Sequence, residues 1–321
     1  MENSSTYNSE RKLWLDALRG IAIILVVFGH QVYSWTEYFV FTSPIKMPLF
    51  FAISGYLFNP RSGNQKSFYK NILKKLIVPW MVLGLFPYVD LPNRFVSLVS
   101  GQSLWFMPCL VIAEILWFYV HKNCKTIVLK CITGLFLCIM GFLFHSFHIF
   151  HFAMVDIAFT VQIFFVIGLL IRQKEHILIN YWRKWTSVTV TCYLFIGICV
   201  LFFFPGQCLD VHLNEYFNIP ICGIMIIFGC VTLFTLFKQS NFSPNWLVYI
   251  GQNTLVIYIL HGYAIALFVN SMQFLHLSDQ QLLPLMGITK TIFGISLCCV
   301  IAFIINKYFP FIVGKKPLNG F

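Results

Sequence analysis

Long apolar runs, hardly interrupted by charge, limit this chain to very few folds. A helix needs about 20 apolar residues to cross the hydrocarbon core of a bilayer. Hydrophobic residues make up 59% of the chain and charged residues only 10%, whereas soluble proteins contain about 25% charged residues, so a soluble globular domain is excluded. Because the runs are continuous rather than alternating, we predict an all-α polytopic membrane protein with about ten transmembrane helices in a single bundle. The predicted spans are 13–35, 40–58, 73–90, 103–121, 126–144, 149–171, 185–205, 216–237, 246–270 and 284–309.

The placement of lysine and arginine predicts which end of each span faces the cytoplasm. With the N-terminus inside and every span crossing, most of the 22 basic residues fall in cytoplasmic segments, as the positive-inside rule requires. We therefore predict a cytoplasmic tail over residues 1–12, a membrane domain over 13–309 and a second cytoplasmic tail over 310–321. The net charge of +11 is interpreted as orientation and contact with anionic membrane lipid, and nucleic-acid binding is not expected.

Ionisable side chains inside the spans are the first candidates for function, because their insertion is costly. They are Asp16, Arg19, His30, Glu114, Asp156 and His261. Asp16 and Arg19, three residues apart, are predicted to form an ion pair. Arg19 and His30 share a helix face, because eleven residues make almost three full turns. From their depths we expect all these groups to border one polar cavity that opens outward, although a bond to a neighbouring helix is an open alternative for several of them.

Three histidines are clustered in the segment HSFHIFH. His145, His148 and His151 lie at intervals of three residues, a spacing that suits Zn²⁺ or Cu²⁺ on a helix. The segment is predicted to be a turn, however, and the interleaved phenylalanines are typical of the membrane interface. We therefore predict no metal.

The string DALRGIAIILVVFGH, which contains Arg19 and His30, resembles the first helix of the acyltransferase-3 family of integral membrane acyltransferases, in particular its short fucose 4-O-acetylase-like members. Further similar segments follow in the family's order: MPLFFAISGYLF over 47–58, LWFM over 104–107 and IGQNTLVIYILHGYAI over 250–265. The resemblance covers essentially the whole chain. The family's basic motif after the second helix is incomplete here, since Lys75 fits the position four residues before Pro79 but Ile72 occupies the position seven residues before it.

The resemblance implies an O-acetyltransferase in a bacterial plasma membrane that takes an acyl group from cytoplasmic acetyl-CoA and places it on a sugar hydroxyl at the outer face. His30 would act as a base or as an acyl carrier, Arg19 would hold the donor, and Asp16 would orient Arg19. Lys70, Lys74 and Lys75 would hold the CoA phosphates. Acceptor binding is expected from Glu114, Asp156, His261, Trp35 and Trp105.

A transporter or flippase of a polysaccharide precursor is the alternative, because buried charges in a multi-helix bundle also suit transport. The sequence shows neither an inverted repeat nor a cluster of carboxylates for a coupling ion. We therefore favour the membrane acyltransferase.

Overall fold

The computed structural model describes residues 12–32, 35–59, 65–86, 90–240, 242–274 and 283–315. Within these ranges the regular secondary structure is helical, apart from a single isolated antiparallel bridge between Asp210 and Glu215. The α-helices are α1 (Leu13–Gly29), α2 (Thr36–Leu57), α3 (Gln65–Ile72), α4 (Val78–Leu85), α5 (Leu91–Ser100), α6 (Phe106–Asn123), α7 (Ile127–Ser146), α8 (Val155–Thr160), α9 (Gln162–Gln173), α10 (Glu175–Phe203), α11 (Ile219–Ser240), α12 (Asn245–Gln252), α13 (Thr254–Phe274) and α14 (Leu283–Tyr308). A π-helical segment, Leu73–Ile77, joins α3 to α4, and short 3-10 segments cover Phe152–Met154 and Pro310–Val313.

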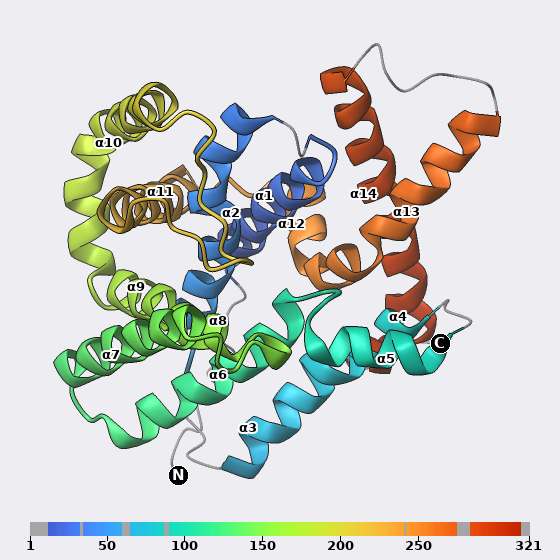
Figure 1. The fold of residues 1–321 in the computed structure, drawn as a ribbon, viewed down its shortest axis with the longest axis horizontal. Helices are drawn as coiled ribbons and strands as arrows, with labels where there is room; N and C mark the ends of the chain where they lie inside the picture. The colour runs from blue at the N-terminus through green and yellow to red at the C-terminus, as the bar shows by residue number, and fades with distance from the viewer. Residues whose placement is uncertain are drawn as a thin grey trace, which may run out of the picture.

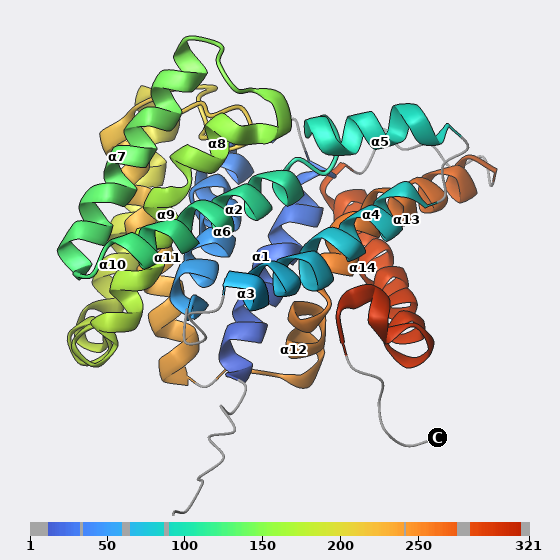
Figure 2. The ribbon, with the colours of Figure 1, turned by 90° about the horizontal axis from the view of Figure 1, so that it is seen from below.

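Helices α1, α2 and α12 lie near the middle of the molecule, with α7 to α11 on one side and α4, α13 and α14 on the other (Figure 1). We call the side on which α1 begins the start side and the opposite side the end side. The start of α1 and α12 lie at one edge of the molecule, whereas α5 and the connection between α7 and α8 lie at the opposite edge (Figure 2). The terms start side and end side are used below for these two edges.

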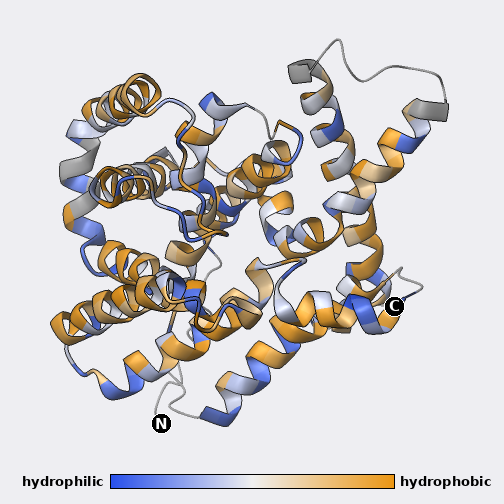
Figure 3. Ribbon diagram, viewed as in Figure 1, coloured by the Kyte–Doolittle hydropathy of each residue, from blue (hydrophilic) through white to orange (hydrophobic). Residues whose placement is uncertain are grey.

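The structure agrees with an all-α membrane protein. Within the described ranges, six helices are long and apolar enough to cross a bilayer: α2, α7, the 184–203 part of α10, α11, α13 and α14. The segment 152–160 together with α9 makes a seventh if this pair, bent by 43°, is one span. Apolar residues cover α7 (Figure 3), and its Val128, Ile132 and Phe136 are more than half exposed, as expected for a helix surrounded by lipid. The predicted number of ten spans is not confirmed.

Three differences between the predicted and the observed helices concern segments near the sites described below. The first span, predicted over 13–35, is helical only to Gly29, where His30 takes the C-cap position. The predicted span 246–270 is divided at Asn253 between α12 and α13. Helix α5 follows an Asp90 N-cap in a segment for which no helix was predicted.

Polar side chains explain the break between α12 and α13. The Asn253 side-chain amide donates to the Tyr249 carbonyl oxygen at 2.8 Å, and the Thr254 hydroxyl donates to the Gly251 carbonyl oxygen at 2.6 Å. Asn306 in α14 donates in turn to Asn253 Oδ1 at 2.8 Å. These bonds satisfy backbone and side-chain groups that an interrupted helix would otherwise leave unpaired inside the protein.

Glycines allow the central helices to approach closely. A Cβ at Gly251 in α12 would overlap the carbonyl oxygen of Asp16 in α1, and a Cβ at Gly168 in α9 would overlap that of Ala52 in α2. Small residues at helix crossings let two backbones meet in this way in membrane proteins. As a result, α12 is fixed beside the start of α1, and the side chains at this crossing form part of the site.

Candidate active site

Two cavities lie along α1 in the described part of the chain. The first has a volume of about 220 Å³ and is lined by Arg19, Lys75 and Gln252 together with apolar side chains. The second has a volume of about 350 Å³ and is lined by polar side chains, namely His30, Ser43, Lys46, Asp210 and His212, and by Trp105. Met47 and Tyr258 line both cavities, so the two spaces meet at a wall of side chains that includes this pair. We call them the Arg19 cavity and the His30 cavity.

The Arg19 cavity carries positive charge held in place by acidic partners. Arg19 forms the predicted ion pair with Asp16, with the nitrogen and oxygen 3.7 Å apart, and the Asp16 side chain is almost completely buried. Gln252 donates to the other carboxylate oxygen of Asp16 at 3.2 Å. Glu114 on α6 interacts electrostatically with both Arg19 and Lys75. This network fixes the guanidinium while leaving it on the cavity wall.

The three lysines predicted to hold the CoA phosphates do not all line the Arg19 cavity. Lys75 lines the Arg19 cavity, and it belongs to the π-helical segment Leu73–Ile77. Single π-helical turns inside α-helices are frequent at functional sites. Lys70 on α3 and Lys74 in the π-helical segment are exposed and do not line the cavity.

The His30 ring, which lines the His30 cavity, lies against the ring of His261, which is not among the lining residues. His30 follows directly after α1, and its ring centroid lies 5.1 Å from that of His261 in α13. His261 Nδ1 is 2.8 Å from the Tyr258 carbonyl oxygen and 3.2 Å from that of Ile257. Nδ1 of His261 must therefore carry a hydrogen, which leaves Nε2 as the acceptor nitrogen of a neutral ring. The two histidines reach the same depth, as their positions along the two spans predicted.

The connection between α10 and α11 closes the other side of the His30 cavity. Asp210 Oδ1 accepts hydrogen bonds from the backbone N–H groups of His212 at 2.8 Å and Leu213 at 3.4 Å, which fixes a tight turn. His212 lies against Trp105, with ring centroids 5.0 Å apart. Burial lowers the pKa of His212, and the Asp210 carboxylate acts in the opposite direction. The turn thus presents a largely neutral ring and a carboxylate to the cavity.

Lys46 supplies a cation from the opposite wall. It belongs to α2, its Nζ lies 4.3 Å from the centroid of the Phe39 ring, and it interacts electrostatically with Asp210. A cation over an aromatic ring is stabilised by the ring quadrupole. The His30 cavity therefore combines imidazole, ammonium, carboxylate and indole groups.

The expectation of a single polar cavity is wrong. Arg19 and His30 do line one face of α1, but they are about 16 Å apart along the helix and border two different cavities. Asp156 lines neither cavity and contacts His145 and His151 instead. Trp35 is 41% exposed and stacks on Tyr38, whereas Trp105 lines the His30 cavity.

Four lining residues were missed as site residues: Lys46, Asp210, His212 and Gln252. Lys46 carried a signal, because it is the only basic residue within the predicted span 40–58. Gln252 lies within the segment that resembles the family's penultimate helix. Asp210 and His212 lie in a connection whose fold is set by the bridge between Asp210 and Glu215, so a hydropathy pattern gives no reason to select them.

Comparison with known proteins identifies the family to which the chain belongs. No curated protein and no solved structure shows significant similarity to the chain. A sequence profile described as an acyltransferase domain matches residues 12–307, which include every helix from α1 to α13 and nearly all of α14. The match also covers the residues that line both cavities. The chain is therefore a member of the acyltransferase-3 family of membrane acyltransferases.

Proposed function

We propose that this acyltransferase moves an acyl group, typically acetyl, from a coenzyme A thioester on the start side to a hydroxyl of a glycan or lipid-linked sugar on the end side. The observation that carries this proposal is the pair of cavities along α1, which share Met47 and Tyr258 as lining residues. One cavity offers cations for an anionic donor, and the other offers imidazoles and hydrogen-bonding groups for a hydroxylated acceptor. The start side is then the cytoplasmic face of a bacterial inner membrane, which agrees with the positive-inside rule.

Donor binding is assigned to Arg19 and Lys75. Coenzyme A carries phosphates at one end and a thioester at the end of a long, thin arm. Guanidinium and ammonium groups bind phosphate, and Arg19 is always charged. Asp16, Gln252 and Glu114 hold the Arg19 side chain and limit its motion. The arm then points along α1 toward His30.

The transfer itself is assigned to His30. Its imidazole takes the proton of the acceptor hydroxyl while the hydroxyl oxygen attacks the thioester carbonyl carbon. The new C–O ester bond forms, the C–S bond breaks, and the departing thiolate receives the proton from the imidazolium. In the variant route, His30 first takes the acyl group onto a ring nitrogen and then passes it to the hydroxyl. His261, whose ring lies beside that of His30, keeps the base oriented.

Acceptor binding is assigned to the His30 cavity. Trp105 offers an aromatic face for a sugar ring, and Asp210 and Lys46 offer an acceptor and a donor of hydrogen bonds to its hydroxyls. The cavity volume of about 350 Å³ falls within the lower range of small-molecule sites. One sugar unit of a longer chain fits this description better than a large oligosaccharide.

Replacement of His30 tests the proposal. Cells that lack the gene are supplied with the wild-type chain or with His30→Ala, and the O-acyl content of their surface glycans is measured by mass spectrometry. We expect His30→Ala to lose the modification although the protein is still present in the membrane at the wild-type level. Incubation of purified protein with acyl-labelled coenzyme A alone then separates the two routes, because only the acyl-histidine route leaves label on the protein. Glycan export with an unchanged acyl content would instead identify a transporter.

A further inference from the structure

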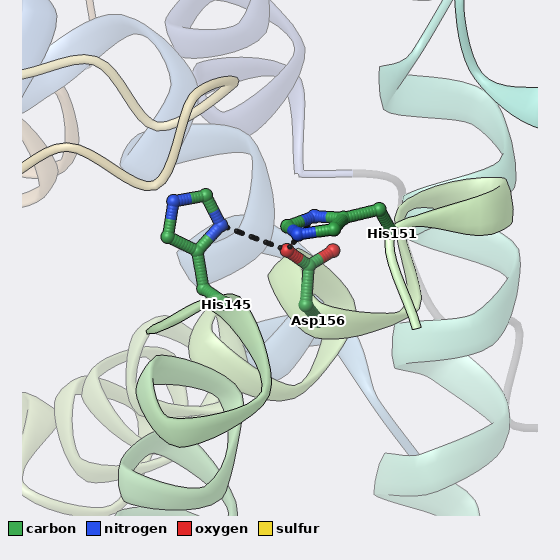
Figure 4. Close-up of side chains that lie close together, drawn as sticks. All are labelled: His145, His151 and Asp156. Carbon is green, nitrogen blue, oxygen red and sulfur yellow. Dashed lines mark hydrogen bonds and ion pairs between the residues drawn. The ribbon is translucent and has the colours of Figure 1, made fainter. Parts of the chain in front are cut away.

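A histidine and carboxylate cluster lies away from both cavities, at the connection between α7 and α8. His145 Nδ1 lies 3.0 Å and His151 Nδ1 lies 2.9 Å from the same oxygen, Oδ2 of Asp156. The three groups come from the last turn of α7, the connection and the first turn of α8, and Figure 4 shows the two rings on either side of the carboxylate. One ligand atom from each residue lies within 4.8 Å of the other two. The arrangement therefore brings together three metal-binding groups from a short stretch of chain.

Close packing of α7 and α8 creates this arrangement. Gly141 in α7 has no room for a Cβ, because it would overlap the backbone nitrogen of Thr160 in α8. His145 lies one helical turn beyond Gly141 and is thereby directed at Asp156. The Thr160 hydroxyl donates to the Asp156 carbonyl oxygen at 3.2 Å, which fixes the start of α8. The carboxylate is thus held by rigid helices.

The connecting segment is held in an unusual backbone conformation. Of the six non-glycine residues with positive φ in the described part of the chain, four lie here: His148, Phe150, Ala153 and Met154. Such conformations cost free energy and persist only where the surroundings enforce them, which is common at functional sites. The strained segment places His151 opposite His145.

The Asp156 carboxylate is buried without enough partners. Its side chain is only 1% exposed, and Oδ1 makes no hydrogen bond within the described part of the chain. A buried ionised carboxylate is costly unless it is paired or bound to a metal. The side chains of His145 and His151 are 34% and 43% exposed, so an ion can reach the carboxylate between them.

We propose that His145, His151 and Asp156 bind a divalent transition-metal ion of the Zn²⁺ type on the end side. Two imidazoles and one carboxylate are a common ligand set for Zn²⁺, with bonds of about 2.0–2.2 Å. Ligand atoms in a tetrahedral site would lie about 3.3 Å apart, close to the observed separations of 2.9 and 3.0 Å. On binding, each neutral ring coordinates through Nδ1 and carries its hydrogen on Nε2. Water or His148, whose ring centroid lies 5.5 Å from that of His151, completes the coordination.

Such an ion would fix the strained connection against the His30 cavity. Met154 packs at Gly101, where a Cβ would come 2.7 Å from the Met154 Cγ, and Gly101 is the C-cap of α5. The chain then runs directly to Trp105 in the cavity wall. The metal site is independent of the proposed acyl transfer, because neither the ligands nor their geometry depends on what the cavities bind.

Metal content tests the proposal directly. The full chain, carrying an affinity tag without histidine, is purified in detergent, incubated with Zn²⁺, desalted and analysed by mass spectrometry for bound zinc. We expect about one equivalent for the wild type. We expect at least a tenfold loss of affinity in His145→Ala, His151→Ala and Asp156→Asn, since even changes behind a ligand cost about 10–100-fold. His176→Ala, which removes an exposed histidine of α10, is the matched control and should keep the ion.

Cobalt adds a readout that identifies the ligands. Bound Co²⁺ should give the visible absorption of a four-coordinate nitrogen and oxygen site, and His151→Cys should add a sulfur-to-cobalt charge-transfer band. Size-exclusion chromatography verifies that each variant remains folded, and His145→Ala and His151→Ala change partly exposed side chains. The proposal is overturned if folded wild-type protein retains no zinc. It also fails if the zinc content of the His145→Ala, His151→Ala and His176→Ala variants is equal, because other groups would then hold the ion.

Discussion

The principal residues of the two cavities, Arg19 and His30, differ in their ability to gain and lose a proton. Arg19 keeps its positive charge under all physiological conditions, whereas an imidazole such as that of His30 can both accept and donate a proton. His261 has its Nδ1 committed to the carbonyls of Tyr258 and Ile257, so it cannot turn without losing those bonds. Its ring therefore acts as a fixed neighbour for His30, and we regard it as a positioning residue.

Lysine replacements at residue scale test the donor site. We expect Lys75→Ala to raise the KM for acetyl-CoA by about 3- to 10-fold with a smaller change in kcat, because loss of one charge–phosphate contact costs roughly 1 kcal/mol at a partly exposed site. Lys70→Ala and Lys74→Ala should change the KM less, since neither lines the Arg19 cavity. The measurement is the rate of thiol release at varied acetyl-CoA concentration. Lys125→Ala, an exposed lysine between α6 and α7, is the control, and an equal effect of all four changes would contradict the assignment.

Individual residues also show what a sequence can predict of such a site. The ion pair of Asp16 with Arg19 follows from helical spacing. The similar depth of His30 and His261 follows from their positions along two spans, but the contact between their rings depends on how α1 and α13 pack. The grouping of Asp156 with His145 and His151 does not, because it depends on Gly141 and on positive φ angles in the connecting segment. For that reason the sequence predicted no metal at these residues, whereas the structure leads us to infer a metal site.

At the scale of elements, the apolar runs predicted most of the helices but not their interruptions. Hydropathy averages over many residues, so it cannot detect a break that depends on the side chains of Asn253 and Asn306. It also does not reveal α5, which is too short for a membrane span and is anchored by Arg94 to the Gly84 carbonyl oxygen and the Ser103 hydroxyl.

Helix packing can be tested at a single glycine. We expect Gly168→Ala to destabilise the protein by about 1–3 kcal/mol, because its methyl group would overlap the Ala52 carbonyl oxygen and force α2 and α9 apart. Gly223→Ala in α11 meets open space and should be neutral or slightly stabilising, since alanine is the better helix former. Thermal unfolding in detergent measures both variants. Equal melting temperatures would show that the close crossing of α2 and α9 does not limit stability.

At the scale of the whole molecule, the fold brings segments that are far apart in sequence together around the two cavities. The two cavities together are lined by residues from α1 and α2, from the region of α4 and α6, from the 204–218 connection and from α12 and α13. The segments that resemble the family's motifs, together with the predicted Lys75, already pointed to all of these regions except the connection. The sequence could not predict the contribution of the connection, because a polar turn between two spans has no hydropathy signal of its own.

The wall that the two cavities share offers a test of whether the donor reaches from one cavity to the other. We expect Met47→Trp to abolish acyl transfer, because the larger side chain fills the space that Met47 shares with Tyr258 between the cavities. Met47→Leu keeps a similar volume and should retain most of the activity. Glycan acylation in cells is the measurement, with the amount of folded protein in the membrane as the control. Full activity of a folded Met47→Trp protein would mean that the donor does not pass this point.

The wall of side chains that the two cavities share at Met47 and Tyr258 has an electrical consequence. A membrane voltage normally falls across about 30 Å of hydrocarbon. Where water-filled spaces approach from both faces, the same voltage falls across the short barrier that remains between them. A unit charge that crosses 100 mV changes in free energy by about 2.3 kcal/mol, so any charged group displaced past this barrier experiences most of that change. Under the proposed function, acyl transfer would then proceed at different rates in energised and depolarised membranes.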